Sequence, residues 1–330
     1  MSPAPPSRGS GASLDTLRAR AQLYARVRAF FAGRGVLEVD TPRLSAAATV
    51  DPNIHSWLAE STVFGCRWLH TSPEFPMKRL LAAGSGPIYQ ICHVFREDEL
   101  GRLHNPEFTM LEWYRPGFDH HRLMDEMEAL LVTLLPAGRL AQQVERLTYR
   151  EAVLREAGID PFTTGASELR NCLERQHDVP VPANVTAEEA VDTDFWLDLL
   201  MGMVVGPRLG QSRLTFIYDY PASQAALARI RPETPPVAER FELYWRGVEL
   251  ANGFHELGDA AEQRRRFIAD QARRRARGQV IPPLDENLLA ALEAGLPDCA
   301  GVALGLDRLL MLALNLDSVS DTLTFPFDCA

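Results

Sequence analysis

Three groups of residues in this sequence have types and spacing that could bind phosphate, a metal ion or an amine. The first is Phe-Arg-Glu-Asp at residues 95–98, followed by His-Asn-Pro-Glu-Phe at residues 104–108. If each borders a strand, the hairpin between them can hold Arg96 against a phosphate, because a guanidinium is a planar bidentate donor with a fixed charge. A surface ion pair would explain an isolated Arg-Glu pair equally well.

The second group is a glycine-containing segment followed by an arginine. Gly301 and Gly305 frame a predicted strand, and Arg308 stands at the start of a helix rich in Leu, Met and Ala. Glycines let another group approach the backbone of a strand closely, and an arginine at a helix N-terminus faces an anion bound there. A tight packing turn between strand and helix would use the same glycines.

The third group consists of the carboxylates Glu242, Glu249 and Glu256, with Gly247 between the first two. Glu242 and Glu249 are seven positions apart, which would place them on opposite faces of a straight strand. A bulge or turn near Gly247 is therefore needed to bring them together. Three carboxylates so arranged could hold Mg²⁺ and a substrate amine, and a solvated charged edge is the alternative.

These groups need strands and helices to position them. Apolar residues recur at helical spacing over residues 14–31, and Gly33 and Gly35 end that helix. The predicted strands cover 36–40, 88–95, 108–114, 214–219 and 240–250, the predicted helices cover 149–157, 167–175 and 260–277, and a last strand and helix cover 301–314. Strands spread this widely, with helices between some of them, indicate an α+β fold around a mainly antiparallel sheet.

The domain organisation predicted from composition is simple. Residues 1–13 are predicted to form a disordered tail, because Ser, Pro and Gly dominate this stretch. Residues 14–330 are predicted to form one α+β domain. The polar stretch around 136–192, which contains several Pro and Gly, is interpreted as a helical insertion.

Composition narrows the classes of function. With 46% apolar and 24% charged residues, the chain of 330 residues has the composition of a soluble globular protein. Its net charge of -10 argues against a general polyanion binder. The five cysteines form no CxxC or Cys/His cluster, so they indicate neither a zinc site nor a disulfide framework. The longest apolar stretch contains Asp307 and Arg308, and no secretory segment is recognisable, so we expect a cytosolic protein without a membrane span.

All three groups together, in this order, resemble the three signature motifs of class II aminoacyl-tRNA synthetases, and the lysyl branch is the closest match. The resemblance covers roughly residues 14–325. It extends to Thr-Ser-Pro-Glu at 71–74, Met-Lys-Arg-Leu at 77–80, Asn-Pro-Glu-Phe-Thr-Met-Leu-Glu at 105–112 and Asn-Gly-Phe at 252–254 with Glu256. It implies the class II catalytic fold, with an antiparallel sheet flanked by helices.

The resemblance implies which residues bind ATP. Arg96 would grip the α-phosphate and Arg308 the γ-phosphate, while Phe108 would stack on adenine. Glu242 and Glu249 would carry Mg²⁺. The expected ATP contacts also include Glu97, Asp98, Asn105, Leu250 and Gly305. Such enzymes activate a substrate carboxylate by positioning and electrostatics, without a covalent enzyme nucleophile.

The resemblance also implies a binding site for a lysine-like amino acid. Glu74, Glu112, Tyr114 and Glu256 match the family's amine-binding positions. A site that removes two ammonium groups from water must supply carboxylates, which favours a lysine-like substrate. The expected substrate contacts also include Ser72, Pro73, Asn252 and Ala303.

Three departures from the lysyl pattern matter. Asp98 stands where a glutamate is usual, so its nucleotide contact is expected to be displaced or bridged by water. Ala303 stands in a segment that typically reads Gly-Leu-Gly-Ile-Gly, so its methyl group should project toward the backbone of the amino acid. The catalytic core is expected to begin near residue 14, which leaves no room for an N-terminal anticodon-binding domain.

A catalytic core of the lysyl type that lacks an anticodon-binding domain is similar to the elongation factor P (R)-β-lysine ligases. The similarity implies ATP-dependent, AMP-forming activation of (R)-β-lysine and its transfer to a lysine ε-amine of elongation factor P. It also implies a homodimer built on the helix before residues 36–42, and little or no action on tRNA. A tRNA-charging lysyl-tRNA synthetase and a non-catalytic regulatory paralogue are the alternatives, although a regulatory paralogue would have lost Arg96 or Arg308.

Overall fold

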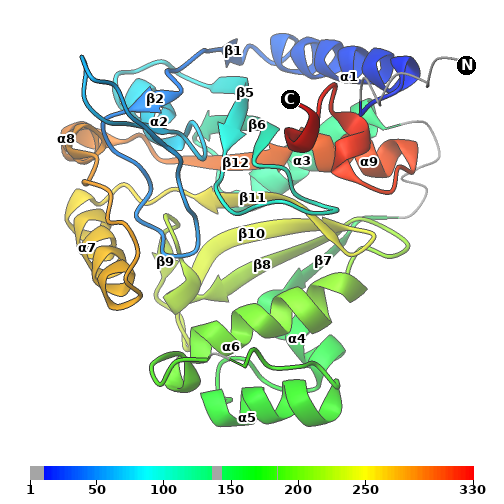
Figure 1. Cartoon of the computed structure of the whole chain (residues 1–330), viewed down its shortest axis with the longest axis vertical. Coiled ribbons are helices and arrows are strands. Elements are labelled where there is room, and N and C mark those ends of the chain that lie inside the picture. Colours follow the sequence, from blue (N-terminus) through cyan, green and yellow to red (C-terminus); the bar gives the residue numbers. More distant parts are fainter. Residues whose placement is uncertain (1–10, 136–142, 184) are drawn as a thin grey trace, which may run out of the picture. The chain divides into compact units, whose positions relative to one another are not determined.

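A computed structural model describes residues 11–135, 143–183 and 185–330 (Figure 1). The described residues fall into two units. Unit 1 takes its residues from Met1–Phe118, Ala129–Pro136 and Leu257–Ala330, and unit 2 from Asp119–Glu128 and Ala137–Glu256. Residues 1–10 of the predicted tail and 136–142 of the predicted insertion lie outside the described residues.

Helix α1 (Leu14–Ala32) closely matches the helix predicted from apolar periodicity. The hydroxyl oxygen of Ser13 caps it by accepting a hydrogen bond from the backbone N–H of Thr16 at 3.1 Å. Gly35, with φ +65°, takes the left-handed conformation that follows the helix. In unit 1, α1 packs beside α9 (Leu306–Leu314), although the two helices come from opposite ends of the chain (Figure 1).

The main sheet of unit 1 carries the predicted hairpin. Its strands are β1 (Leu37–Glu38), β5 (Ile88–Phe95), β6 (Glu107–Pro116) and β12 (Cys299–Gly305). β1 runs parallel to β5, and β5, β6 and β12 are antiparallel neighbours in that order. The prediction for β5 is therefore confirmed, and β6 is slightly longer than predicted.

The rest of unit 1 is a small sheet and a set of helices. The small sheet has the order β2 (Leu44–Ser45), β4 (Arg67–Leu69), β3 (Leu58–Ala59). The helices are α2 (Glu74–Ala82), α7 (Ala260–Ala276), α8 (Glu286–Gly295) and α9. α8 packs against both α2 and α7. α9 begins directly after β12, which confirms the predicted strand and helix at 301–314.

Unit 2 combines a sheet with a helical layer. Its strands are β7 (Glu145–Thr148), β8 (Thr215–Pro221), β9 (Ile230–Arg231), β10 (Val237–Trp245) and β11 (Val248–His255). β7 is parallel to β8, whereas β8, β10 and β11 are antiparallel, and β9 pairs with β10. Its helices are α4 (Tyr149–Ala157), α5 (Ala166–Asn171) and α6 (Thr193–Leu200). These helices supply much of the unit's buried apolar cluster, including Tyr149, Leu169 and Trp196.

Some elements of unit 2 differ from those predicted from the sequence. The single strand predicted over 240–250 is two strands, because Arg246 and Gly247 form a turn with positive φ. The helix predicted at 149–157 is confirmed, and the one at 167–175 is α5 continued by a π-helical turn, Cys172–Gln176. The stretch interpreted as a helical insertion also contains a strand, β7, which pairs with β8.

Both units mix helices with mainly antiparallel strands, so the predicted α+β fold class is confirmed. Helix α3 (His120–Leu134) begins in unit 2 and ends in unit 1. Among the described residues, every helix is too short or too polar to cross a membrane.

Candidate functional site

Arg96 lies directly after β5, at the base of the hairpin in unit 1. Its backbone N–H donates to the carbonyl oxygen of Pro106 at 2.9 Å, which fixes its position beside the start of β6. Its guanidinium carbon lies 5.1 Å from the ring centroid of Phe108, and its Nη1 lies 3.6 Å from the carboxylate of Glu99. Its buried Nε has no hydrogen-bond partner within the described chain. This arginine therefore has a donor left for an acceptor outside the protein.

Arg308 lies in the first turn of α9 and reaches the same hairpin loop. Its Nε donates to the carbonyl oxygen of Leu103 at 3.1 Å, and its Nη2 lies 2.7 Å from Nε2 of His104. Because arginine only donates, Nε2 of His104 must accept, so the imidazole is neutral. Burial, and then the charge of Arg308, lowers the pKa of His104. The structure thus attaches both predicted phosphate-binding arginines to one loop.

A neighbouring loop supports the acidic residues of this hairpin. The backbone N–H of Glu97 donates to the carbonyl oxygen of His55 at 2.9 Å, and Nδ1 of His55 lies 3.2 Å from Oδ2 of Asp98. Nε2 of Gln279 lies 3.2 Å from Nε2 of His55. Since the Gln279 amide nitrogen donates, Nε2 of His55 accepts, and the N–H at Nδ1 of His55 donates a hydrogen bond to Asp98. Glu97 and Asp98 are exposed, and Asp98 has φ +65°.

The loop of His55 is in turn held by a buried arginine. Arg274 of α7 donates to the carbonyl oxygens of Val50 at 3.0 Å, Asp51 at 2.6 Å and Ile54 at 2.5 Å. Burial lowers the pKa of Arg274. Arg274 therefore acts through backbone contacts, and it positions the loop that reaches the hairpin.

Asn105 is buried, and backbone groups bind both ends of its side-chain amide. Nδ2 donates to the carbonyl oxygen of Glu107 at 2.6 Å, and Oδ1 accepts from the backbone N–H of Phe327 at 3.1 Å. The side chain thus shapes the loop and anchors the C-terminal segment. Gly305, the residue before α9, ends β12 opposite Met110 of β6.

Glu112 is the centre of a buried polar group on β6. The hydroxyl of Ser72 donates to its Oε2 at 2.7 Å, and the hydroxyl of Tyr114 donates to its Oε1 at 2.6 Å. Ser72 also accepts from the backbone N–H of Glu74 at 3.0 Å, just after Pro73, which precedes α2. The two hydroxyls satisfy hydrogen bonds of the carboxylate and orient it.

Glu74 lies within reach of the only lysine, Lys78, which is one helical turn further along α2. The Nζ of Lys78 lies 2.8 Å from Oε1 of Glu74, and the lysine side chain is buried. This ion pair compensates the charge of Glu74 inside the protein. Glu74 is therefore less available for a ligand ammonium than the family resemblance suggested.

Ala303 of β12 lies directly opposite Glu112 of β6. Directly opposite residues share one face of a sheet, so the methyl group of Ala303 and the carboxylate of Glu112 point the same way. Gly301 lies opposite Tyr114 on the same face. The methyl group of Ala303 therefore lies on the face of the buried carboxylate, and its approach to the backbone of a bound amino acid stays a prediction.

The carboxylates Glu242 and Glu249 lie in unit 2. The register of β10 and β11 shifts between Leu243 and Tyr244, and Leu250 is the extra residue of the bulge. Glu249 therefore lies opposite Tyr244, whose hydroxyl donates to Oε2 of Glu242 at 2.6 Å. The irregularity predicted from their odd spacing is present, and the two carboxylates share a face.

Other residues complete this acidic face. Arg240 donates to Oε1 of Glu242 at 2.5 Å and to Oδ1 of Asn252 at 3.3 Å. Burial, and then the charge of Glu242, raises the pKa of Tyr244, so its phenol remains a donor. Glu256 is buried just beyond β11, where its backbone pairs with that of Ala228.

The predicted residues are thus divided between the two units. Unit 1 holds Ser72, Pro73, Glu74, Arg96, Glu97, Asp98, Asn105, Phe108, Glu112, Tyr114, Ala303, Gly305 and Arg308, and unit 2 holds Glu242, Glu249, Leu250, Asn252 and Glu256. The supporting contacts of His55, Lys78, Arg274 and Gln279 were not predicted. Their partners are distant in sequence or belong to the backbone, so no motif marks them.

Residues 10–328 match the family described as tRNA synthetases class II (D, K and N). The sequence is 51% identical over 321 residues to the elongation factor P–(R)-beta-lysine ligase of Vibrio cholerae, covering 96% of each chain. It is 51% identical to the Vibrio vulnificus protein of the same name, over 97% of this chain and 98% of the relative. For the Salmonella typhi protein, also of that name, identity is 49% over 97% of each chain.

Proposed function

Because the chain belongs to the class II tRNA synthetases of the D, K and N type, we propose that it activates (R)-β-lysine with ATP and transfers it to a lysine of elongation factor P. The observation that carries the proposal is its near-complete match, at 49–51% identity, to ligases whose names state that substrate and acceptor. The family predicted from the three signature groups is the family that matches.

The proposed reaction has two steps. One carboxylate oxygen of (R)-β-lysine attacks the α-phosphorus of ATP, the bond from this phosphorus to the bridging oxygen breaks, and pyrophosphate leaves. The acceptor ε-amine then attacks the acyl carbon, loses a proton and displaces AMP. Neither step requires an enzyme nucleophile, so positioning and charge stabilisation are the protein's contribution.

Arg96 and Arg308 are the residues that we assign to the nucleotide phosphates. The buried Nε of Arg96, without a partner in the described chain, and its packing over Phe108 support a role at the α-phosphate. The anchoring of Arg308 to Leu103 and His104 supports a fixed cation at the γ-phosphate. Fixed donors need no reorganisation when charge develops on the leaving group.

We assign the amine of the substrate to the buried group around Glu112. The Glu112 carboxylate is buried and oriented by the Ser72 and Tyr114 hydroxyls, and a buried carboxylate can compensate an ammonium group that leaves water. Glu256 remains the proposed second carboxylate. Ser72, Pro73, Glu74, Asn252 and Ala303 remain the proposed neighbours of the ligand.

Glu242 and Glu249 fit a magnesium site in their chemistry. They offer carboxylate oxygens on one face, the ligand type that Mg²⁺ prefers. Bound there, the ion would neutralise charge on the nucleotide phosphates. The hydrogen bond from Arg240 to Glu242 orients this carboxylate within the protein.

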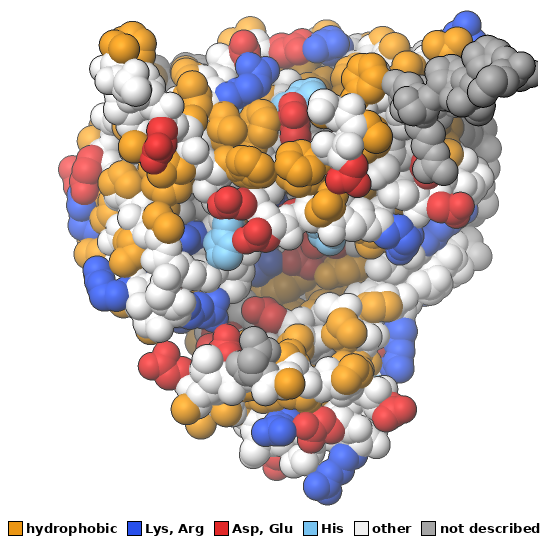
Figure 2. Space-filling model, in the orientation of Figure 1, with side chains coloured by type: hydrophobic (Ala, Val, Ile, Leu, Met, Phe, Trp, Pro, Cys, Tyr) orange, Lys and Arg blue, Asp and Glu red, His pale blue; other side chains and the backbone are white. Residues whose placement is uncertain are grey.

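We propose that individual exposed arginines, rather than a continuous basic surface, contact elongation factor P. On the face shown in Figure 2, acidic and basic side chains are interspersed, in keeping with the net charge of -10. Among the arginines at 263–277, Arg274 is buried on backbone carbonyls and is excluded from this contact. Exposed Arg275, Arg277 and Arg102 remain candidates.

A homodimer in the cytosol is the state that we propose for the active protein. Leu37 of β1 is 57% exposed and Leu44 of β2 is 51% exposed, and both follow α1, the helix assigned to the dimer interface. Burial of such side chains would favour association. Light scattering coupled to size-exclusion chromatography should give twice the mass of 36.8 kDa.

Pyrophosphate exchange with different amino acids tests the activation step. The assay compares (R)-β-lysine, (S)-β-lysine and α-lysine at equal concentrations, with a control that lacks amino acid. We expect the highest kcat/KM for (R)-β-lysine. Exchange restricted to α-lysine would contradict the substrate assignment, and no exchange with any of them would contradict the ligase assignment.

A further inference from the structure

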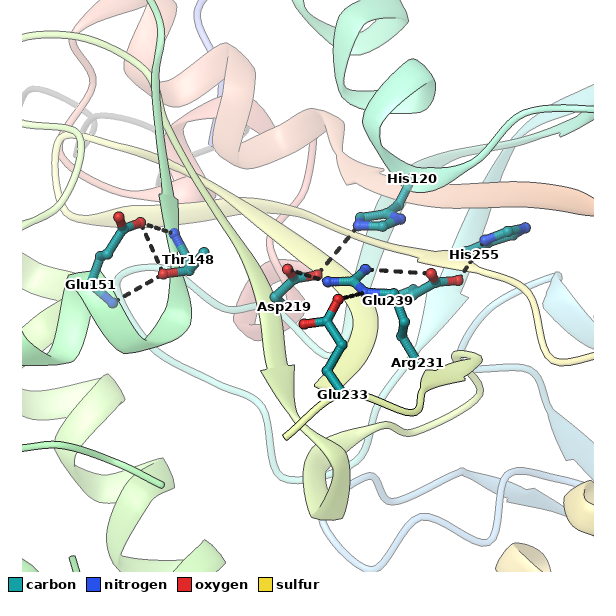
Figure 3. Close-up of polar contacts among 8 residues, drawn as sticks. All are labelled: His120, Thr148, Glu151, Asp219, Arg231, Glu233, Glu239 and His255. Atoms are coloured by element: carbon teal, nitrogen blue, oxygen red, sulfur yellow. Dashed lines mark hydrogen bonds and ion pairs between the residues drawn. The ribbon is translucent and has the colours of Figure 1, made fainter. Parts of the chain in front are cut away.

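Two histidines and two carboxylates of unit 2, each from a different helix or strand, lie close together (Figure 3). His120 begins α3, Asp219 lies on β8, Glu239 on β10 and His255 at the end of β11. One possible ligand atom from each of His120, Glu239 and His255 lies within 4.8 Å of the others. We propose that these three residues bind a divalent transition-metal ion of the zinc type.

The imidazole of His120 is the observation that carries the proposal. The residue is only 2% exposed, and neither ring nitrogen has a hydrogen-bond partner within the described chain. The nearest charged atom is Oδ1 of Asp219, 3.5 Å from Nε2, and this buried oxygen also lacks a hydrogen bond. Buried polar groups are normally satisfied, so these atoms point to a ligand that binds between them.

His255 and Glu239, the other two proposed ligands, contact each other directly. Nδ1 of His255 lies 2.6 Å from Oε2 of Glu239, a hydrogen-bond distance. Arg240 pairs with Phe254 across β10 and β11, so Glu239 and His255 fall opposite each other on the sheet. A bound metal ion would replace the proton between them, and the two atoms would separate to roughly 3.3 Å, as tetrahedral coordination at about 2 Å requires.

Arg231 binds one oxygen of each of the two carboxylates. Its Nη2 lies 2.7 Å from Oδ2 of Asp219, and its Nη1 lies 3.4 Å from Oε1 of Glu239 (Figure 3). Its Nε lies 2.5 Å from Oε1 of Glu233. The remaining oxygen of Asp219 faces His120, and the remaining oxygen of Glu239 faces His255. The guanidinium therefore orients the carboxylates and leaves the histidine side of the cluster open to a cation.

The charges of the cluster suit a divalent ion. Asp219, Glu233 and Glu239 carry three negative charges against one positive charge on Arg231, so two negative charges are left when the histidines are neutral. Two imidazoles and one carboxylate are a zinc-type ligand set, because Mg²⁺ and Ca²⁺ prefer oxygen ligands alone. Asp219 would hold the ring of His120 in place from outside the metal shell.

This site is separate from the residues assigned to the reaction. Successive side chains of a strand point to opposite faces, so His255 faces away from the side that carries Asn252. Likewise, Glu239 faces away from its neighbour Arg240, which binds Glu242 and Asn252. The metal ion would therefore join α3 to the sheet of unit 2 and stabilise its fold, without contacting substrate.

Metal titration of the full-length protein tests the proposal. After chelation and dialysis, Co²⁺ is added and visible absorption is followed, and Zn²⁺ is then added as a competitor. The wild-type protein should take up one equivalent with the absorption of tetrahedral Co²⁺, and Zn²⁺ should displace it and raise Tm. No inner-sphere absorption and no change of Tm would overturn the proposal.

Single substitutions test which side chains bind the metal ion. His120→Gln and Glu239→Gln should each weaken Zn²⁺ binding by at least about 10-fold. His121→Gln is the matched control, because His121 is the adjacent histidine and is exposed, and it should bind as the wild type does. Unchanged affinity in His120→Gln would refute the assignment. If that variant fails to fold, Glu239→Gln and the wild-type titration still decide.

Discussion

Nη2 of Arg20 lies 2.6 Å from Oδ1 of Asp307, in a buried ion pair that joins α1 to the residue directly before Arg308. The other oxygen of Asp307 accepts from the backbone N–H of Thr109 at 2.7 Å, and Arg20 also donates to the Thr109 hydroxyl at 2.6 Å. The side chains of Arg20 and Asp307 are 14% and 4% exposed. This group therefore ties α1, β6 and the start of α9 together behind the proposed phosphate-binding arginine.

We predict that Arg20→Met lowers the free energy of unfolding by about 3–5 kcal/mol, because it leaves the charge of Asp307 buried without its cation. Urea denaturation measures this loss. Arg18→Met is the matched control on the same helix, since Arg18 and Asp15 form an exposed pair, 72% and 91% exposed, that should contribute little. Equal losses in both variants would contradict a special role for the buried pair.

Arg96→Ala and Arg308→Ala should each lower ATP–pyrophosphate exchange by at least about two orders of magnitude. This is the scale for removing one preorganised charged donor from a transition state. Arg170→Ala serves as the control, because Arg170 forms an exposed pair with Glu174 in unit 2. Near-normal exchange in either Arg96→Ala or Arg308→Ala would remove that residue from the nucleotide site.

Ala303→Gly should improve the use of α-lysine relative to (R)-β-lysine. The substitution removes a methyl group on the face of Glu112, and one methyl in a tight pocket is worth about 1–3 kcal/mol. The ratio of kcat/KM for the two substrates in pyrophosphate exchange is the readout. Ala300→Gly makes the same chemical change on the other face of β12 and should leave the ratio unchanged. An unchanged ratio in Ala303→Gly as well would show that this methyl does not set the preference.

The contact between Arg308 and His104 should make activity sensitive to acid. Burial, and then Arg308, lowers the pKa of His104 below its ordinary value of 6.5. As pH falls from 6.5 toward that lower pKa, the unfolded state takes up the proton first, so stability falls in this window. Once protonated, the imidazole repels Arg308, so exchange should fall too.

His104→Gln separates this effect from general acid sensitivity. The glutamine amide oxygen can accept from Arg308 but does not titrate. Pyrophosphate exchange by the variant, measured from about pH 7.5 to about pH 5.5, should therefore lose less activity than the wild type does. The same acid limb in both proteins would assign the pH dependence to another group.

Local signals explain which elements could be predicted from the sequence. β5 was found because most of its residues are β-branched, aromatic or otherwise apolar. α4 has clear local signals, since Thr148 and Glu151 form a capping box and Gly158 ends the helix. β7 was missed because its residues, Glu-Arg-Leu-Thr, have little apolar character, and its pairing with β8 stabilises it. Strand formation there is decided by tertiary contacts.

The same distinction applies to the candidate site. Arg96, Arg308 and the carboxylates stand in contiguous motifs, so their types and spacing were visible. The pair Arg20–Asp307 and the cluster of His120, Glu239 and His255 combine residues from distant elements. No local pattern marks such residues, because only the fold brings them together. The ion pair of Glu74 with Lys78 has the ordinary spacing of an exposed helical pair, so its burial could be seen only in the structure.

The transfer reaction tests the central claim most directly. The protein is incubated with ATP and (R)-β-lysine, together with either elongation factor P or total tRNA, and the acyl group is followed by mass spectrometry. We predict a mass increase of one lysyl group on a single lysine of elongation factor P, lost in Arg308→Ala, with little or no acylated tRNA. Efficient charging of tRNA without a mass shift on the factor would contradict the account.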